Sequence, residues 1–436
     1  MSQLSRHPRA LLERIFAGAV AAVAPGPAVQ RAVAGLEIGS AAWVRILALG
    51  KAAVPMATAA ARALADRGLR VRDGLVVPPE PALLSRPEFQ VVPGDHPLPG
   101  PRSRQAAAAL DRFARDGRPG DLVLVLLSGG TSSLVAAPVP GFTETGLAEL
   151  HAWLLAAGLP IHDTNRLRRR FARWGAGRLA LALAPARVEV LAVSDVPGDA
   201  IGDIGSGPCS PDPDTAAGLL AWLGEAGLGD ALPAEARAHL DGVLAARWPE
   251  TPKPGDPGLS GVHTRVVAAN RDAVQGALRA AEAAGLVALA AGEPLAGEAA
   301  AMGRQVARRL VDAPPAAAPT CLVWGGETVV RLAPGSRGEG GRCQELALAA
   351  AEVLAAARGE RPALLAAGTD GRDGATPAAG GFADPGTWRR IGASGRDPAA
   401  DLAAHRSHPA LHAAGAVLVT GPTGTNVMDL VIALPA

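Results

Sequence analysis

The chain is poor in aromatic residues and in cysteine. Among its 436 residues there is no tyrosine, aromatic residues make up 3%, and there are three cysteines. So few aromatic rings argue against a surface on which single-stranded nucleic acid stacks. The cysteines, Cys209, Cys321 and Cys343, are scattered without metal-ligand spacing, which excludes a disulfide framework and fits a reducing compartment. We therefore expect a cytoplasmic protein with structural cysteines.

The chain also lacks an excess of either charge and lacks long apolar runs. Its 42 Lys and Arg oppose 41 Asp and Glu, so no broad positive field attracts a polyanion, and no nucleic-acid partner is expected. The apolar stretch 15–23 has helical spacing and is followed by Pro25, Gly26 and Pro27, which favours an amphipathic helix over a secretory signal. We expect no segment to span a bilayer and no membrane partner.

Length and pattern predict two α/β domains, because 436 residues exceed one ordinary core. Apolar runs at 44–49, 122–127 and 188–193 are each followed by a turn, as for strands buried on both faces of a parallel sheet. After a Pro- and Gly-rich stretch, further strands are expected at 264–269, 320–324, 328–332, 362–367, 417–420 and 430–434, with a helix at 344–357. We predict α/β/α domains over 1–245 and 246–436, with largely parallel sheets.

Small and charged residues concentrate where these strands end, the place where ligands of open α/β sheets bind. After the second run, Ser128, Gly129, Gly130, Thr131 and Ser132 form a loop whose small residues let backbone amides approach phosphate oxygens. The alternative is an ordinary tight turn. Lys51 follows the first run, where its ammonium group could neutralise a phosphate or a carboxylate or simply be solvated.

Carboxylates follow the third run. Asp195 and Asp199 offer hard oxygen ligands suited to magnesium, or a base for a hydroxyl group, and Asp203 lies nearby. The alternative is that they are turn and helix-cap aspartates.

The second half has its own glycine-rich segment, in which Gly338, Gly340 and Gly341 precede Arg342. An arginine there could hold a phosphoryl or carboxylate group in a bidentate manner. The segments 368–371 and 421–426 also follow predicted strands. The Walker A motif, the protein-kinase motifs, the Rossmann fingerprint and the His-Glu-x-x-His zinc motif do not occur.

Together, these segments resemble the glycerate 2-kinase family, formerly known as hydroxypyruvate reductase, whose carboxyl-terminal portion is the MOFRL domain. The resemblance covers nearly the whole chain. It is carried, in chain order, by LALGKAA (47–53), GDHPLPG (94–100), LSGGTSSL (127–134), SDVPGD (194–199), SGPCSPDPDT (206–215), GGETVV (325–330), GRCQELAL (341–348), GTDGRDG (368–374) and TGPTGTNVMDL (420–430).

The resemblance implies phosphoryl transfer from ATP to the 2-hydroxyl of D-glycerate, with Mg²⁺, in a cleft between two α/β domains. Lys51 and Arg342 match functional basic positions of the family, and Asp195 becomes the candidate for orienting the hydroxyl or, with Asp199, for holding magnesium. Oligomeric state stays open, with a homodimer as one candidate. The residues expected to bind substrate or nucleotide are His96, Ser128, Gly129, Gly130, Thr131, Ser132, Arg168, Glu327, Asp370, Thr423 and Asn426.

Some positions depart from the family pattern, and they bear on the identity of the substrate. They are Gly100, Arg169, Arg170, Gly175, Cys343, Pro377, His405 and Arg406. The run Arg168 to Arg170 is either a solvated helix face or, at Arg168, an anion-binding site. Two other functions stay open: a hydroxypyruvate reductase, against which the missing dinucleotide fingerprint counts, and a weakly active relative that binds a hydroxy-acid or a nucleotide.

Overall fold

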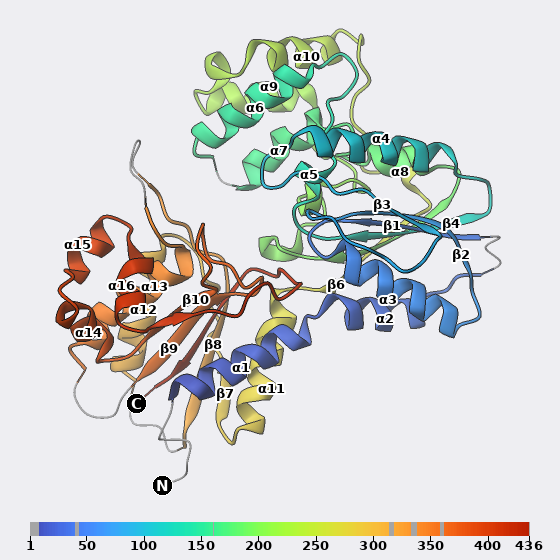
Figure 1. Ribbon diagram of the computed structural model, residues 1–436. Helices are drawn as coiled ribbons and strands as arrows, with labels where there is room; N and C mark the ends of the chain where they lie inside the picture. Colours follow the sequence, from blue (N-terminus) through green and yellow to red (C-terminus); the bar gives the residue numbers. More distant parts are fainter. Residues whose placement is uncertain are drawn as a thin grey trace. The chain divides into compact units, whose positions relative to one another are not determined.

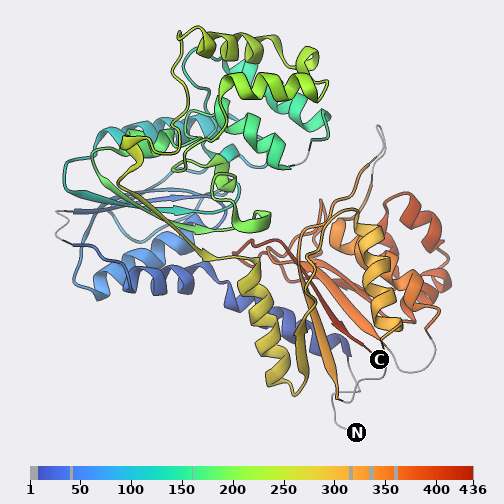
Figure 2. The ribbon, with the colours of Figure 1, turned by 180° about the vertical axis from the view of Figure 1, so that it is seen from behind.

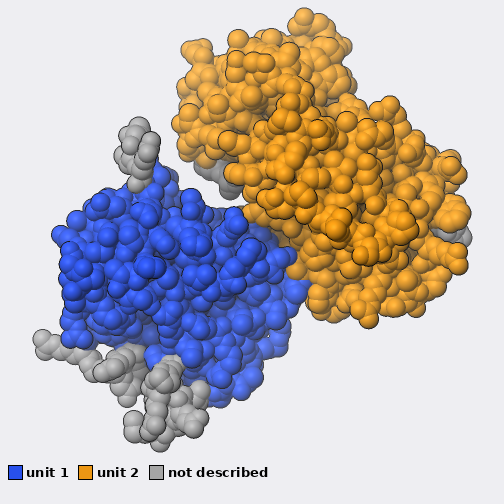
Figure 3. Space-filling view, viewed as in Figure 1, with its two compact units in different colours: residues 1–24, 268–436 blue, residues 25–267 orange. Residues whose placement is uncertain are grey.

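The computed structural model describes residues 8–39, 43–159, 161–313, 318–332, 338–357 and 362–435. The chain forms two compact units, coloured separately in Figure 3 and drawn as ribbons in Figures 1 and 2. One unit comprises residues 25–267, and the other comprises residues 1–24 together with 268–436. The chain thus passes between units at 24/25 and 267/268, which differs from the expected single boundary at 245/246.

The 25–267 unit contains a six-stranded sheet in the order β3-β2-β1-β4-β5-β6. Its strands are β1 (Trp43–Leu49), β2 (Val71–Val77), β3 (Phe89–Val91), β4 (Asp121–Leu127), β5 (Arg187–Val193) and β6 (Val262–Ala268). The pairs from β3 through β5 are all parallel. β4 is buried along its whole length, and β1 is buried from Val44 onward, as expected of strands covered on both faces. The predicted strands at 44–49, 122–127 and 188–193 are confirmed.

Strand β6 corrects the predicted domain boundary. We expected a strand at 264–269 to open the second domain, but β6 lies beside β5 at the edge of the first sheet. The N–H of Val188 donates to the carbonyl of Gly261 at 3.1 Å, and the N–H of Asp212 to that of Pro252 at 2.8 Å. These bonds tie the Pro- and Gly-rich stretch before β6 to the first unit.

Helices cover both faces of this sheet (Figure 1): α2 (Pro25–Ala34) and α3 (Ala53–Asp66) on one face, α4 (Pro101–Arg115) and α8 (Arg178–Leu183) on the other. The short α5 (Thr131–Leu134) follows β4. A further group packs around its own apolar cluster, which includes Leu150, Phe171 and Leu219. That group comprises α6 (Glu144–Ala156), α7 (Ile161–Phe171), α9 (Ala216–Glu225) and α10 (Ala234–Leu244).

The other unit contains a six-stranded sheet in the order β11-β10-β9-β12-β8-β7. Its strands are β7 (Val287–Ala290), β8 (Thr320–Gly326), β9 (Ala363–Gly368), β10 (Gly380–Ala383), β11 (Val417–Leu418) and β12 (Asp429–Leu434). The α/β class is confirmed, but this sheet is not largely parallel: β7–β8 is parallel and the other four pairs are antiparallel. Parallel neighbours need a long crossover, usually a helix, and residues 369–379 join β9 to β10 without one.

The predicted strand at 328–332 does not form, and Val329 makes an isolated bridge with Glu298 instead. Around the sheet lie α11 (Asn270–Ala283), α12 (Ala299–Val311), α13 (Arg342–Leu354), α14 (Thr387–Ala393), α15 (Pro398–Ala403) and α16 (Ser407–Ala413). α13 packs against α12, β9 and β10. The helix predicted at 344–357 is therefore confirmed, two residues longer at its start and three shorter at its end.

The first helix, α1 (Pro8–Ala22), belongs to this second unit because it packs against α11. A Cβ atom placed on Gly18 would lie 2.6 Å from the Cβ of Ala280, and one on Gly276 would lie 2.5 Å from that of Ala22. Small residues on both helices therefore permit the close approach, and this contact assigns α1 to the unit that contains α11.

We expected no segment long and apolar enough to span a bilayer, and residues 8–34 correct this expectation. By length and composition alone, they would suffice to cross a membrane. They form two helices, α1 and α2, which lie in different units. The large apolar side chains of α1 are buried inside the protein, as in a core helix: Leu11, Leu12, Ile15 and Phe16.

Candidate active site

Loops that follow β1, β4 and β5 come together in the 25–267 unit. These strands are adjacent and parallel, so their carboxyl ends lie at one edge of the sheet. The N–H of Lys51, after β1, donates to the carbonyl of Gly129, after β4, at 2.9 Å. The Oγ of Ser128 accepts the N–H of Ala52 at 3.1 Å and donates to the carbonyl of Leu49 at 3.2 Å. The predicted serine- and glycine-rich loop is therefore held against the turn that carries Lys51.

Two glycines of this loop bring the charged side chains close together. A Cβ atom on Gly129 would lie 1.9 Å from Oδ2 of Asp195, so the carboxylate rests directly on the glycine. Gly130 has a φ of +88°, and a Cβ there would lie 3.0 Å from Cδ2 of His96 and 3.4 Å from Cγ of Lys51. The structure thus brings together four predicted segments: the glycines Gly129 and Gly130 are surrounded by Lys51, His96 and Asp195, each from a different segment.

A compact loop presents His96. Asp95 accepts hydrogen bonds from the N–H and the Nε of Arg102 at 2.8 and 2.7 Å, and Ser103 Oγ accepts the N–H of Asp95 at 3.0 Å. Gly100 is one of the positions that depart from the family pattern. A Cβ atom there would lie only 2.6 Å from the Asp95 carboxylate, so the close approach of Asp95 favours glycine. Partial desolvation and the charge of Lys51 lower the pKa of His96, so its imidazole is neutral at pH 7.

The remaining loop residues have local partners. Thr131 Oγ1 donates to the carbonyl of Ser128 at 2.8 Å, and the hydroxyl oxygens of Ser132 and Ser206 are 2.7 Å apart. Asp199 lies on the same loop as Asp195, in the 3-10 turn Pro197–Asp199, with a φ of +56°.

The described residues contain no group of three or more His, Cys, Asp or Glu side chains arranged to hold a metal ion. A magnesium ion carried by a nucleotide needs only one or two protein carboxylates, because phosphates and waters complete its octahedron. Asp195, half-buried beside Gly129, fits that smaller demand.

A second cluster of predicted residues lies in the other unit, around Arg342 at the first position of α13. Its Nε and Nη2 contact the carboxylate of Asp429 at 2.5 and 3.0 Å, and its Nη1 contacts Glu327 at 2.5 Å. Although burial alone would lower it, the charges of Asp429 and Glu327 raise the pKa of Arg342. The guanidinium is therefore charged and held by two carboxylates.

Asp429 was not among the predicted site residues. Its position in the sequence could have indicated it, because Asp429 is the acidic residue of the family segment TGPTGTNVMDL. In the structure it is the first residue of β12. Asn270 was also missed: its side chain donates to the carbonyls of Val427 and Asp429 at 2.8 and 3.1 Å and thereby holds the start of β12.

The amino end of α13 is occupied by a carboxylate of the protein itself. Asp373 accepts hydrogen bonds from the N–H groups of Cys343 and Gln344 at 3.0 and 2.8 Å, and from Gln344 Nε2 at 2.9 Å. Burial raises the pKa of Asp373 to about 6. A helix amino end attracts anions, and here an internal one takes the place that a ligand phosphate could fill.

Asp370, Thr423 and Asn426 lie at the ends of β9 and β12 in the same unit. The N–H of Thr423 donates to the carbonyl of Asp370 at 3.2 Å, and Asn426 Oδ1 accepts the N–H of Met428 at 3.3 Å. A Cβ on Gly368 would lie 3.3 Å from the carboxylates of both Asp370 and Asp429, which brings Asp370 close to the partner of Arg342.

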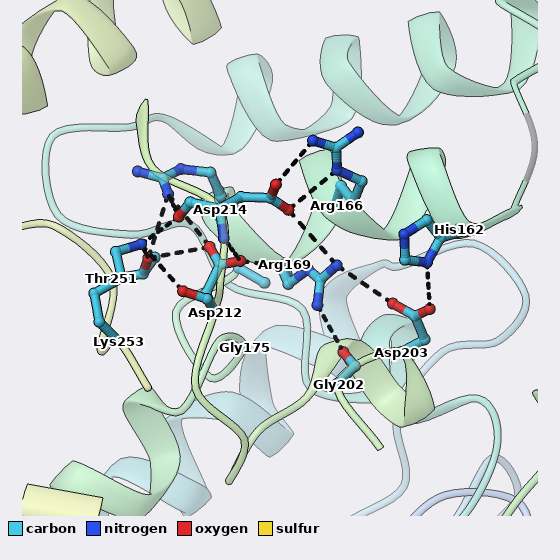
Figure 4. A network of polar contacts seen from close by, with 12 residues as sticks. His162, Arg166, Arg169, Gly175, Gly202, Asp203, Asp212, Asp214, Thr251 and Lys253 are labelled. Carbon is cyan, nitrogen blue, oxygen red and sulfur yellow. Dashed lines mark hydrogen bonds and ion pairs between the residues drawn. The ribbon is translucent and has the colours of Figure 1, made fainter. Parts of the chain in front are cut away.

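Arg168 lies on α7, half-buried, and burial lowers its pKa. Burial and the charge of Arg168 lower the pKa of His151, on α6, to about 4. The neighbouring arginines are not a solvated face, because Arg169 and Arg170 are both buried. Figure 4 shows Arg169 among acidic residues. Arg170 contacts Asp212 at 3.3 Å. That alternative for the run is therefore wrong at Arg169 and Arg170.

The turn after α7 is held by Arg178. Its guanidinium donates to the carbonyls of Arg169 and Ala172 at 3.2 Å and to that of Arg170 at 2.9 Å, and burial lowers its pKa to about 10. A Cβ on Gly175 would lie 2.8 Å from the carbonyl of Arg169, so a larger residue would need a backbone shift.

Comparisons with known proteins cover most of the chain. Residues 11–241 match the family model "Domain of unknown function (DUF4147)", and residues 320–429 match the "MOFRL family". The D-glycerate 2-kinase of Thermotoga maritima is 35% identical over 421 residues, 95% of each chain. An Agrobacterium vitis protein provisionally named hydroxypyruvate reductase is 37% identical over 426 residues, 97% of this chain and 93% of its own.

A solved structure resembles the whole chain. The crystal structure of the Thermotoga maritima glycerate kinase has a TM-score of 0.84 at 34% identity, with 99% of this chain and 100% of that chain covered. The predicted resemblance is confirmed by sequence and by structure, and the chain belongs to the glycerate 2-kinase family.

Proposed function

We propose that this protein transfers the γ-phosphoryl group of ATP to the 2-hydroxyl of D-glycerate, giving 2-phosphoglycerate and ADP. The names of the Thermotoga maritima relative and of the human glycerate kinase, which is 32% identical over 95% of this chain, support this reaction. The observation that carries the proposal is the convergence of Lys51, His96 and Asp195 on Gly129 and Gly130.

Phosphoryl transfer chiefly needs positioning and neutralisation of charge on the transferred oxygens. In the proposal, the Lys51 ammonium neutralises that charge, while the backbone of the Ser128 to Ser132 loop positions the anion. Asp195 accepts the hydrogen bond of the 2-hydroxyl, and the neutral imidazole of His96 binds the substrate.

Arg168 is the candidate for the carboxylate of glycerate. Burial of its guanidinium lowers the pKa of Arg168, and the charge of Arg168 in turn contributes to the lowered pKa of His151. A bound carboxylate would restore the charge balance.

In the other unit, Arg342 is the second cation of the proposal, and Glu327 and Asp429 position it. Asp370, Thr423 and Asn426 remain candidates for nucleotide contacts. Asp195, with Asp199 in support, would hold Mg²⁺, which would supply positive charge to offset that of the ATP phosphates. The cytoplasmic location stays a prediction supported by three free, buried cysteines, and the homodimer stays a prediction.

The test is ADP formation from Mg²⁺, ATP and D-glycerate, with the product identified by NMR. We expect 2-phosphoglycerate from the wild type and a loss of about 100-fold or more in kcat for Lys51→Ala and Arg342→Lys. Arg331→Ala is the matched control, because Arg331 is an exposed cation paired with Glu298. Wild-type protein that releases no ADP, or a Lys51→Ala variant with full activity, would contradict the proposal.

A second candidate reaction, reduction of hydroxypyruvate, is favoured by the name of the Agrobacterium vitis relative. Oxidation of NADH in the presence of hydroxypyruvate, followed by absorbance, separates the two reactions. We expect no oxidation, since the dinucleotide fingerprint is missing from the sequence.

A further inference from the structure

Ser206 is a buried residue in an unfavourable backbone conformation. Its side chain is 1% exposed, and its φ is +66°, between Gly205 at +59° and Gly207 at +60°. Glycine adopts this left-handed region freely, whereas a residue with a Cβ is strained there. Strain of this kind persists when the surrounding structure requires it, and it concentrates at functional sites.

The side chain of Ser206 contacts the loop after β4. Its hydroxyl oxygen lies 2.7 Å from that of Ser132, which is half-buried. A Cβ placed on Gly205 would lie 2.9 Å from the Cβ of Thr131, so the turn at 205–207 also packs directly against α5. Ser206 therefore meets the serine- and glycine-rich loop through its hydroxyl and through the backbone beside it.

The turn is held in place from behind. The carbonyls of Ser206 and Gly207 accept the N–H groups of Ala176 and Gly177 at 2.9 and 2.8 Å. Three residues earlier, Asp203 contacts His162 at 2.9 Å and Arg169 at 3.4 Å, as Figure 4 shows. These contacts restrain Ser206 on both sides and keep its hydroxyl directed at Ser132.

We propose that Ser206 is a positioning residue for the reaction. The Ser206 hydroxyl donates to Ser132 Oγ and so leaves the Ser132 hydroxyl hydrogen available to an anionic oxygen, either a phosphate of ATP or the carboxylate of glycerate. A hydroxyl has one hydrogen to donate, so fixing the direction of one bond fixes the other. The inference rests on the proposed function and extends it to a residue that contacts the substrate only through Ser132.

The test compares Ser206→Gly, Ser206→Ala and Ser132→Ala, singly and combined, in kcat and in KM for ATP and for D-glycerate. Loss of one hydrogen bond to a charged group corresponds to about tenfold in kcat/KM, and we expect that loss in both Ser206 variants. Ser206→Gly relieves the strain, so its unfolding temperature should exceed that of Ser206→Ala although its activity is equally low. The KM that rises identifies the anion as ATP or glycerate.

Coupling through Ser132 is the decisive readout. In the Ser132→Ala background, Ser206→Gly should change kcat/KM by less than about twofold, because the group that it positions is gone. Ala246→Gly is the matched control: Ala246 is exposed with a φ of +54°, and its replacement should leave kcat/KM unchanged. A Ser206→Gly variant with wild-type kcat/KM, or an equal loss in both backgrounds, would overturn the inference while leaving the proposed function intact. Absence of wild-type turnover is seen before any variant is compared and overturns both.

Discussion

Gly129 offers the sharpest test of the site geometry, because one added methyl group would displace one carboxylate. In Gly129→Ala the new Cβ would lie 1.9 Å from Oδ2 and 2.7 Å from Cγ of Asp195. Ordinary contact begins near 3.4 Å, so the carboxylate would have to move by about 1.5 Å. A misplacement of about 1 Å in a reacting group can cost about 100-fold in rate, so we expect kcat to fall by 100-fold or more.

The fold should tolerate this substitution. The carbonyl of Gly129 would still accept the N–H of Lys51, and an aspartate side chain can rotate away from the new methyl group. The assay is ADP release with ATP and D-glycerate, beside urea unfolding. Gly224→Ala is the matched control: a Cβ there meets nothing within 4 Å, so activity should be unchanged and stability should rise by about 0.5–1 kcal/mol.

Two results would refute the reasoning. One is a Gly129→Ala variant that keeps kcat within about threefold of wild type, since the displaced carboxylate would then be unimportant. The other is a further large loss when Gly129→Ala is added to Asp195→Ala, because no carboxylate remains there to be displaced.

Three further predictions concern residues that hold the Arg342 cluster and the end of α7 in place. The pKa of Asp373 is raised from 3.8 to about 6, so its protonated carboxyl group stabilises the fold below pH 4, and this stabilisation is lost as the pH rises to about 6. In urea unfolding, the stability of the wild type relative to Asp373→Asn should therefore fall by up to about 3 kcal/mol over that pH range. A stability difference that does not change with pH would contradict this prediction. Arg178→Met should cost about 2–4 kcal/mol in the same assay, because buried carbonyls at the end of α7 lose their donor, and a loss below about 1 kcal/mol would count against this role. Asp429→Asn removes the carboxylate that Arg342 contacts through two nitrogens, so kcat should fall about tenfold. The KM for ATP shows whether the nucleotide site persists, and circular dichroism shows whether the fold persists. An unchanged kcat would exclude a positioning role for Asp429.

Sequence pattern was sufficient for the buried parallel strands and for the loops that follow them. The runs at 44–49, 122–127 and 188–193 are apolar without alternation, and such runs form strands covered on both faces. Because adjacent parallel strands end at one edge, Lys51, Ser128 to Ser132 and Asp195 could be expected to lie together from the order of the strands and loops. The resemblance to the family added His96 and the reaction.

Tertiary structure alone decided the features that depend on contacts between distant segments. The N-terminal helix joins the second unit through small residues that face α11, and β12 inserts between β8 and β9 in antiparallel register; local propensity encodes neither contact. Asp429 and Ser206 likewise looked like ordinary motif residues until the fold placed one on Arg342 and the other on Ser132. The periodicity of apolar residues predicts which segments are buried, because burial depends on the residues along a single element. The partner of a polar side chain depends on which elements pack together, and the sequence of one element does not specify that.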